Sequence, residues 1–120
     1  MTFSVDVWLR GDDFAITAAI DRVEAAPRSW TDDDVEVVLE EMLRSMRRAR
    51  YPGEPERAVA LRGLSWIVNP FEGGGVVIAI EIALGAVVAG PFDIEQPVLE
   101  QMIARVLARP LAPPASTAVH

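Results

Sequence analysis

The chain has 120 residues, no cysteine and a formal net charge of −7. A chain of this length forms one domain and hides roughly two-thirds of its unfolded surface on folding. The absence of cysteine excludes disulfides, thiolate metal ligands and a cysteine nucleophile. The acidic balance disfavours binding to the phosphate backbones of nucleic acids.

The first predicted strand covers residues 3–10, where apolar and polar side chains alternate. A period of two is typical of a half-buried strand, and it places Trp8 on the polar side. Asp12 and Asp13 then offer helix caps, and apolar residues recur at helical spacing until a proline stops the pattern. We therefore expect a first helix over residues 12–27.

A second helix is predicted after residue 31 by the strongest local pattern in the chain. Residues 31–34 resemble a capping box, and the acidic first turn and arginine-rich last turn match the helix dipole. Pro52 ends the helix. Its apolar stripe consists of Val35, Val38, Leu39, Met42, Leu43 and Met46. This stripe predicts burial in a core or a contact with another helix.

Further strands and a last helix are predicted in the second half of the chain. Residues 58–69 form a strand, and a glycine-rich turn leads into an apolar segment at residues 75–90. That segment has a bulky face and a smaller face that holds Glu81. It forms either one strand or two strands that are split at Gly85. Pro97 suits the first turn of the last helix.

The elements follow the order β-α-α-β-β-α. This order predicts an α+β fold, with a small, mainly antiparallel sheet of three or four strands and three helices on one of its faces. We expect a single domain over residues 1–108. Residues 109–120 are rich in proline and alanine and predict a disordered tail.

A membrane span over residues 75–92 is disfavoured. Glu81 lies near the middle of this apolar run, at a cost of roughly 3 kcal/mol for a carboxylate in lipid. The uninterrupted apolar pieces are shorter than the ~20 residues that a spanning helix needs.

No signal peptide is visible, so we expect a cytoplasmic protein without membrane contact. All eleven basic residues are arginine, which indicates a GC-rich bacterial genome.

The residues that usually carry catalysis are scarce. His120 is the only histidine and the last residue, so nucleophiles that depend on a histidine base are excluded. The clusters at residues 12–13 and 32–34 could hold Mg²⁺ or Ca²⁺, but each begins a predicted helix, where aspartate serves as a cap. We therefore expect no metal, no cofactor and no enzyme activity of these kinds.

A basic patch covers residues 44–62. It contains six arginines and two glutamates, a local charge of +4 in an acidic chain. Arg44, Arg47 and Arg48 lie on the second predicted helix, and Arg62 lies on the following strand. The patch either binds an anion or an acidic partner, or is a solvated helix end that complements the dipole.

Two functions are compatible with these observations. The first is a non-enzymatic interaction or oligomerisation module, because the segment at residues 75–90 has two apolar faces and helices on one side cover only one. A homodimer or a protein partner would cover the other, and replacing Ile80 with aspartate would then break the assembly.

The alternative is a ligand-binding or enzyme domain with Glu81 and Arg62 in a pocket between sheet and helices. Trp66 would form a wall of this pocket, and Glu81 is a weak candidate base. An exposed Glu81 would favour the first function, and a buried one beside a cavity the second.

Overall fold

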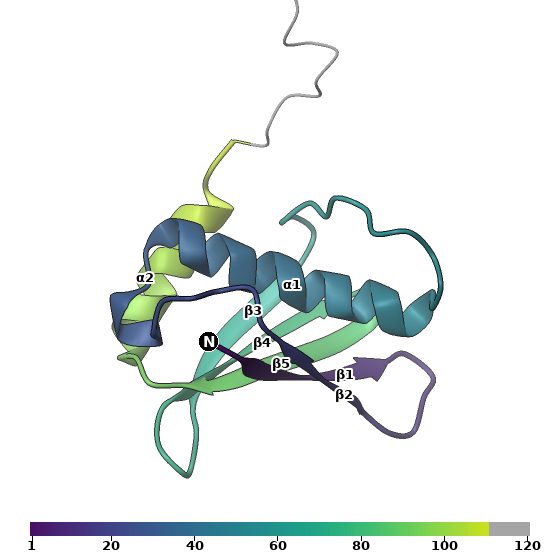
Figure 1. Ribbon diagram of the computed structural model, residues 1–120, viewed down its shortest axis with the longest axis horizontal. Helices are drawn as coiled ribbons and strands as arrows, with labels where there is room; N and C mark the ends of the chain where they lie inside the picture. The colour runs from purple at the N-terminus through teal and green to yellow at the C-terminus, as the bar shows by residue number, and fades with distance from the viewer. Residues whose placement is uncertain (111–120) are drawn as a thin grey trace, which may run out of the picture.

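Two helices lie on one face of a five-stranded antiparallel sheet in the computed structural model, which describes residues 1–110 (Figure 1). The strands are β1 (Phe3–Leu9), β2 (Ile16–Ile20), β3 (Ser65–Pro70), β4 (Val76–Ile82) and β5 (Gly85–Phe92). The helices are α1 (Asp32–Arg50) and α2 (Gln96–Leu107), and a short 3-10 turn, η1 (Pro27–Ser29), precedes α1. Of the predicted tail, residues 111–120 lie outside the described residues.

The strands are ordered β2-β1-β5-β4-β3 across the sheet, and every neighbouring pair is antiparallel. β5 is therefore the central strand, with two strands on each side. α1 packs across β1 and β5, whereas α2 packs against β3 and against α1. The general class predicted from the sequence, α+β with an antiparallel sheet, is confirmed; the sheet has five strands and the described residues contain two α-helices.

The helix predicted over residues 12–27 is wrong. The chain instead turns back at residues 10–15, and β2 pairs with β1 in a register that sets Ile20 opposite Phe3 and Ile16 opposite Val7. Ile16 and Ile20 are four residues apart, a spacing that fits a helix and an alternating strand equally well. Pairing with β1 decides between the two, because β-branched residues gain more from a cross-strand neighbour than from an exposed helix.

α1 begins as the sequence predicts. The Thr31 hydroxyl accepts a hydrogen bond from the Asp34 backbone N–H (3.3 Å), and the Asp34 carboxylate accepts one from the Thr31 N–H (3.0 Å). These two bonds complete a capping box and satisfy donors that a helix start otherwise leaves unpaired. The predicted apolar stripe of α1 is buried along its whole length against the sheet and α2.

The segment at residues 75–90 forms two strands. β4 and β5 are joined by a tight turn and pair with each other from Ile82 opposite Gly85 to Val76 opposite Phe92. The strand predicted over residues 58–69 begins only at Ser65, and residues 58–64 form part of the loop after α1. Apolar residues in that loop misled the prediction, because they pack against the edge of the core without pairing as a strand.

Both helices pack on the same face of the sheet. The face under the helices, here called the inner face, carries the bulky side chains of β4 and β5, among them Ile78, Ile80 and Val87, which are almost fully buried. The expectation that Ile80 lies on a surface for a partner is therefore wrong. Within the described residues, neither helix is long and apolar enough to cross a membrane.

Candidate interaction surface

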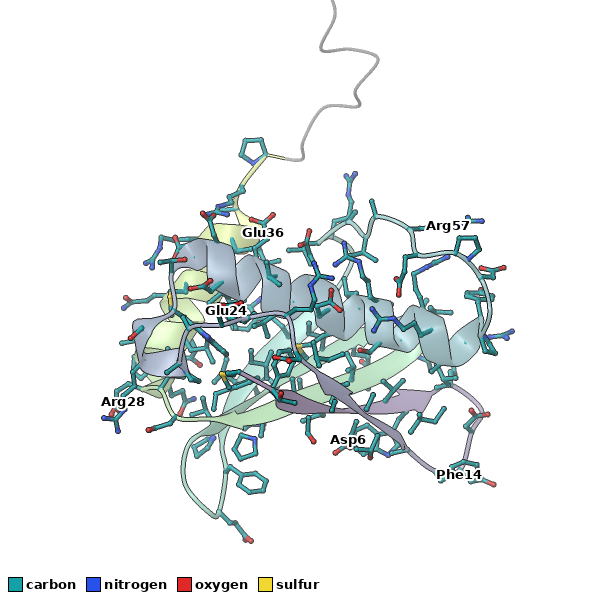
Figure 2. The ribbon with its side chains drawn as sticks, viewed as in Figure 1. Asp6, Phe14, Glu24, Arg28, Glu36 and Arg57 are labelled. Atoms are coloured by element: carbon teal, nitrogen blue, oxygen red, sulfur yellow. The ribbon has the colours of Figure 1, made fainter. Side chains whose placement is uncertain are left out.

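The second face of the sheet, here called the outer face, is covered by neither helix (Figure 1). In Figure 2, Asp6 projects from this side, away from α1. The alternation along each strand assigns the outer-face residues, which are Ser4, Asp6, Trp8, Thr17, Ala19, Ser65, Ile67, Asn69, Val77, Ala79, Glu81, Ala86 and Val88. The outer face is therefore made by all five strands.

An apolar strip crosses the middle of the outer face. Trp8 on β1 is 41% exposed and Ile67 on β3 is 51% exposed, although both are large apolar side chains. Ala79 and Val88 lie between them as a cross-strand pair, and both are half-buried by their neighbours. An antiparallel sheet commonly leaves one face to solvent, but that face is then mainly polar. Here its centre is apolar and its polar groups lie around the strip.

Glu81 lies on the outer face, where it is exposed. Its cross-strand neighbours are Ser65 on β3 and Ala86 on β5, and Ala86 is in turn opposite Trp8 on β1. Glu81 forms no ion pair within the described residues. A shallow depression of the sheet lies beside it, with Ile67 and Ala79 among its lining residues. This exposed position is the environment that the sequence analysis associated with an interaction surface.

Arg62 and Trp66 lie apart from Glu81. Arg62 belongs to the loop after α1 and lines a cleft on the helix side, with Leu43 of α1 below it. Trp66 is half-buried on the inner face, opposite Ile80, and packs against the core. The space between sheet and helices is filled by the core, so Glu81 and Arg62 do not line a common pocket there.

Arg44 and Arg48 surround a residue that the sequence analysis did not single out. Glu41 of α1 is 1% exposed, and its two carboxylate oxygens receive hydrogen bonds from Arg44 (3.1 Å), Arg48 (3.2 Å) and Arg22 (3.0 Å). A buried carboxylate requires such partners, because an unpaired charge in the interior is strongly disfavoured. The helical spacing of Glu41 with Arg44 and Arg48 was the signal that could have revealed this cluster.

Arg47 differs from its neighbours because no carboxylate within the described residues pairs with it. Its guanidinium lies 5.3 Å from the ring centre of Tyr51, and that of Arg50 lies 5.2 Å from the same ring. These distances are within the range of cation–π contacts. Arg44, Arg47 and Arg48 are thus brought together on α1, but only Arg47 keeps a charge that no carboxylate neutralises.

Among residues 1–110, no three acidic or histidine side chains gather closely enough to hold a metal ion. No family model matches the chain, and neither a curated protein nor a solved structure is detectably similar to it.

Proposed function

We propose that the protein is a non-enzymatic interaction module that forms a two-fold dimer through its outer face. The observation that carries the proposal is the apolar strip from Trp8 to Ile67, which neither helix covers. Contiguous apolar surface of this kind is typical of interaction sites, whereas singly scattered apolar side chains are ordinary. The alternative with a pocket built from Glu81 and Arg62 lacks such support, since these side chains line separate hollows.

A second copy of the chain suits this face because of the strand order. The order β2-β1-β5-β4-β3 has two strands on each side of β5. A two-fold axis parallel to β5 therefore places β1 of one copy over β4 of the other. Homo-oligomers most often form such closed two-fold pairs, in which one patch meets its own copy. Val88 then lies near the axis and meets Val88 of the second copy.

The same arrangement matches opposite charges. Trp8 and Glu81 lie in one row across the sheet, so Trp8 and the neighbouring Arg10 of one copy approach Glu81 of the other. Within the described residues Arg10 has no carboxylate partner, and its Nε donates to the backbone oxygen of Ala83. The two-fold pair would therefore form two Arg10–Glu81 contacts at the edge of an apolar centre.

The size of the face is sufficient for a weak or moderate dimer. Five strands spaced about 4.8 Å apart and about 20 Å long give a footprint of roughly 500 Å² per copy. Two such footprints total about 1,000 Å², the lower limit for a specific interface. We therefore expect a dimer that dissociates on dilution.

Sedimentation velocity over a range of protein concentrations tests the proposal. The wild-type chain should change from monomer to dimer as its concentration rises. Val88→Asp should raise the dissociation constant by about 100-fold or more, because it buries an unpaired charge near the axis. Val98→Asp is the matched control, since Val98 is exposed on α2, away from the outer face. A wild-type chain that stays monomeric at every concentration would exclude self-association.

An exchange of charges tests the two-fold geometry itself. Arg10→Glu and Glu81→Arg should each weaken the dimer, because each places like charges opposite one another. The double variant Arg10→Glu/Glu81→Arg should restore association, since the opposite charges meet again in exchanged positions. Single variants that associate as the wild type does, or a double variant without recovery, would reject this arrangement of the two copies.

A further inference from the structure

The arginines of the chain divide into two groups by their partners. All eleven lie within the described residues. Carboxylates pair with Arg22, Arg28, Arg44, Arg48, Arg105 and Arg109. No carboxylate of residues 1–110 pairs with Arg10, Arg47, Arg50, Arg57 or Arg62. Four of these five lie at the end of α1 and in the loop that follows it, in a protein whose net charge is −7.

This concentration of positive charge creates a local potential that attracts anionic groups, although the chain as a whole is acidic. The chain has eighteen acidic residues, more than enough to pair every arginine. A helix C-terminus attracts cations, and this accounts for Arg47 and Arg50 in the last turn of α1. It does not account for Arg57 and Arg62, which lie in the loop. Figure 2 shows Arg57 in this loop, above the last turns of α1 in this view.

Two adjoining hollows lie between α1 and the loop at residues 51–62, and Arg47 lines both. The first is narrow, about 20 Å³. Four arginines line it, including Arg44 and Arg57, against two glutamates, Glu54 and Glu56, so its lining keeps a positive balance. A space of this size holds little more than one water-sized group, such as a carboxylate oxygen. The second hollow is wider, about 200 Å³, with Arg62 among its lining residues.

The wider hollow has an apolar floor. Leu43 of α1 and Val59 of the loop line it together with Ile82 and Leu84, which belong to the β4–β5 hairpin. All four side chains are buried or half-buried parts of the core edge. The hollow therefore offers space for an apolar side chain. Arg47 and Arg62 supply the charged part of its lining.

The wall of the narrow hollow is fixed before any ligand binds. Arg48 donates from Nε to Glu56 and from Nη2 to the buried Glu41, so it ties the loop to α1. The ring of Tyr51 lies against the guanidinium of Arg47. A site whose walls are already ordered loses less conformational entropy when a ligand binds.

We propose that the groove between α1 and residues 51–62 binds a peptide segment of a partner protein in which a carboxylate lies next to an apolar side chain. The partner is acidic because Arg47, Arg57 and Arg62, which no carboxylate of residues 1–110 pairs with, place positive charge along the groove. The apolar floor of the wider hollow selects an apolar neighbour for the carboxylate. The groove lies on the helix side, so each copy of a dimer formed through the outer face would present one.

Fluorescence anisotropy with a short labelled peptide of alternating glutamate and leucine tests the groove. The probe should bind saturably, and its affinity should fall as salt concentration rises, because exposed charges are screened. A peptide of alternating lysine and leucine should not bind, and one of glutamate and serine should bind at least about tenfold more weakly. No saturable binding of the first probe, or equal binding of the lysine probe, would overturn the proposal.

Two variants of equal charge locate the site. Arg47→Glu/Arg62→Glu should weaken binding of the glutamate–leucine probe by about 100-fold, because two ion pairs with the probe are lost. Arg28→Glu/Arg109→Glu changes the charge equally, at exposed positions outside both hollows. Circular dichroism must show that both proteins are folded, and Arg62→Glu alone should still weaken binding by about tenfold. An affinity that falls equally in both double variants, or is unchanged in the folded Arg62→Glu variant, would overturn the site.

Discussion

Arg105 of α2 forms a two-pronged ion pair with Asp32, the first residue of α1. Its Nε and Nη2 atoms each lie 2.9 Å from a different carboxylate oxygen of Asp32. The pair joins residues 73 positions apart and fixes the start of one helix against the other. The hydrogen bond from Arg105 is the main cause that lowers the pKa of Asp32 below its ordinary value.

Asp32→Asn should therefore destabilise the fold in a way that depends on pH. A carboxyl group whose pKa is lowered by folding stabilises the protein above its ordinary pKa of 3.8, and this contribution is lost as pH falls through the folded value. Urea unfolding should show a less stable variant at neutral pH and a smaller difference below pH 3.8. Asp13→Asn is the control, because Asp13 is exposed and has no ion pair within the described residues. A difference for Asp32→Asn that is constant with pH would contradict the assignment.

Glu41→Ala should be among the most destabilising changes on α1. It leaves Arg22, Arg44 and Arg48 without their common buried partner, and breaking a buried charge cluster typically costs about 3 kcal/mol or more. Glu40→Ala is the matched control on the same helix. Burial raises the pKa of Glu40, so its charge is disfavoured in the folded state, and its loss should change the free energy of unfolding by less than about 0.5 kcal/mol. Equal effects of the two changes in urea unfolding would refute the role of Glu41.

Local patterns predicted those parts of the fold in which local and long-range interactions agree. The capping box and apolar stripe of α1 are fixed by residues close in sequence, and both were found where expected. β2 was not predicted, because the spacing of Ile16 and Ile20 suits both a helix and a strand, and only pairing with β1 distinguishes them. The sequence pattern of residues 75–90 indicates two apolar faces. It does not indicate which of them the helices cover, since that depends on where the helices pack.

The candidate surfaces also depend on contacts between distant residues, which local sequence patterns do not reveal. The arginines of residues 44–62 were recognised as a patch, but the sequence could not divide them into those that neutralise Glu41 and those that stay unpaired. That division depends on burial and on the path of the loop after α1. Likewise, the alternative hypothesis of a common pocket for Glu81 and Arg62 depended on the expectation that the two residues lie on neighbouring strands. Arg62 lies instead in the loop before β3, where it lines a cleft on the helix side.

Gly85→Ala should destabilise the fold far more than Gly63→Ala. Gly85 begins β5 with a φ of +152°, and an added Cβ would lie 2.1 Å from the backbone oxygen of Trp8. Backbone on the neighbouring strand cannot yield as a flexible side chain can, so we expect a loss of about 3 kcal/mol or more. Gly63→Ala is the control, since its φ is also positive but no atom lies within 4 Å of the added Cβ. Its cost should stay near 1 kcal/mol. Thermal unfolding measures the loss in each variant, and an equal loss in the two would contradict the close packing of β5 on β1.

The same substitution at two tryptophans should separate folding from association. Trp30 is buried, its ring packs edge-on against Phe92 at 4.8 Å, and its Nε1 donates to the Ala25 backbone oxygen (3.0 Å). Trp30→Ala should lower the free energy of unfolding by roughly 3–5 kcal/mol.

Trp8→Ala removes a side chain from the open outer face and should cost less than about 1 kcal/mol in the monomer. It should nevertheless weaken the dimer strongly, because large aromatic side chains dominate interface energies. Urea unfolding at low protein concentration measures the first effect, and sedimentation velocity at high concentration measures the second. A Trp8→Ala variant that is as unstable as Trp30→Ala would place Trp8 in the core and remove it from the proposed interface.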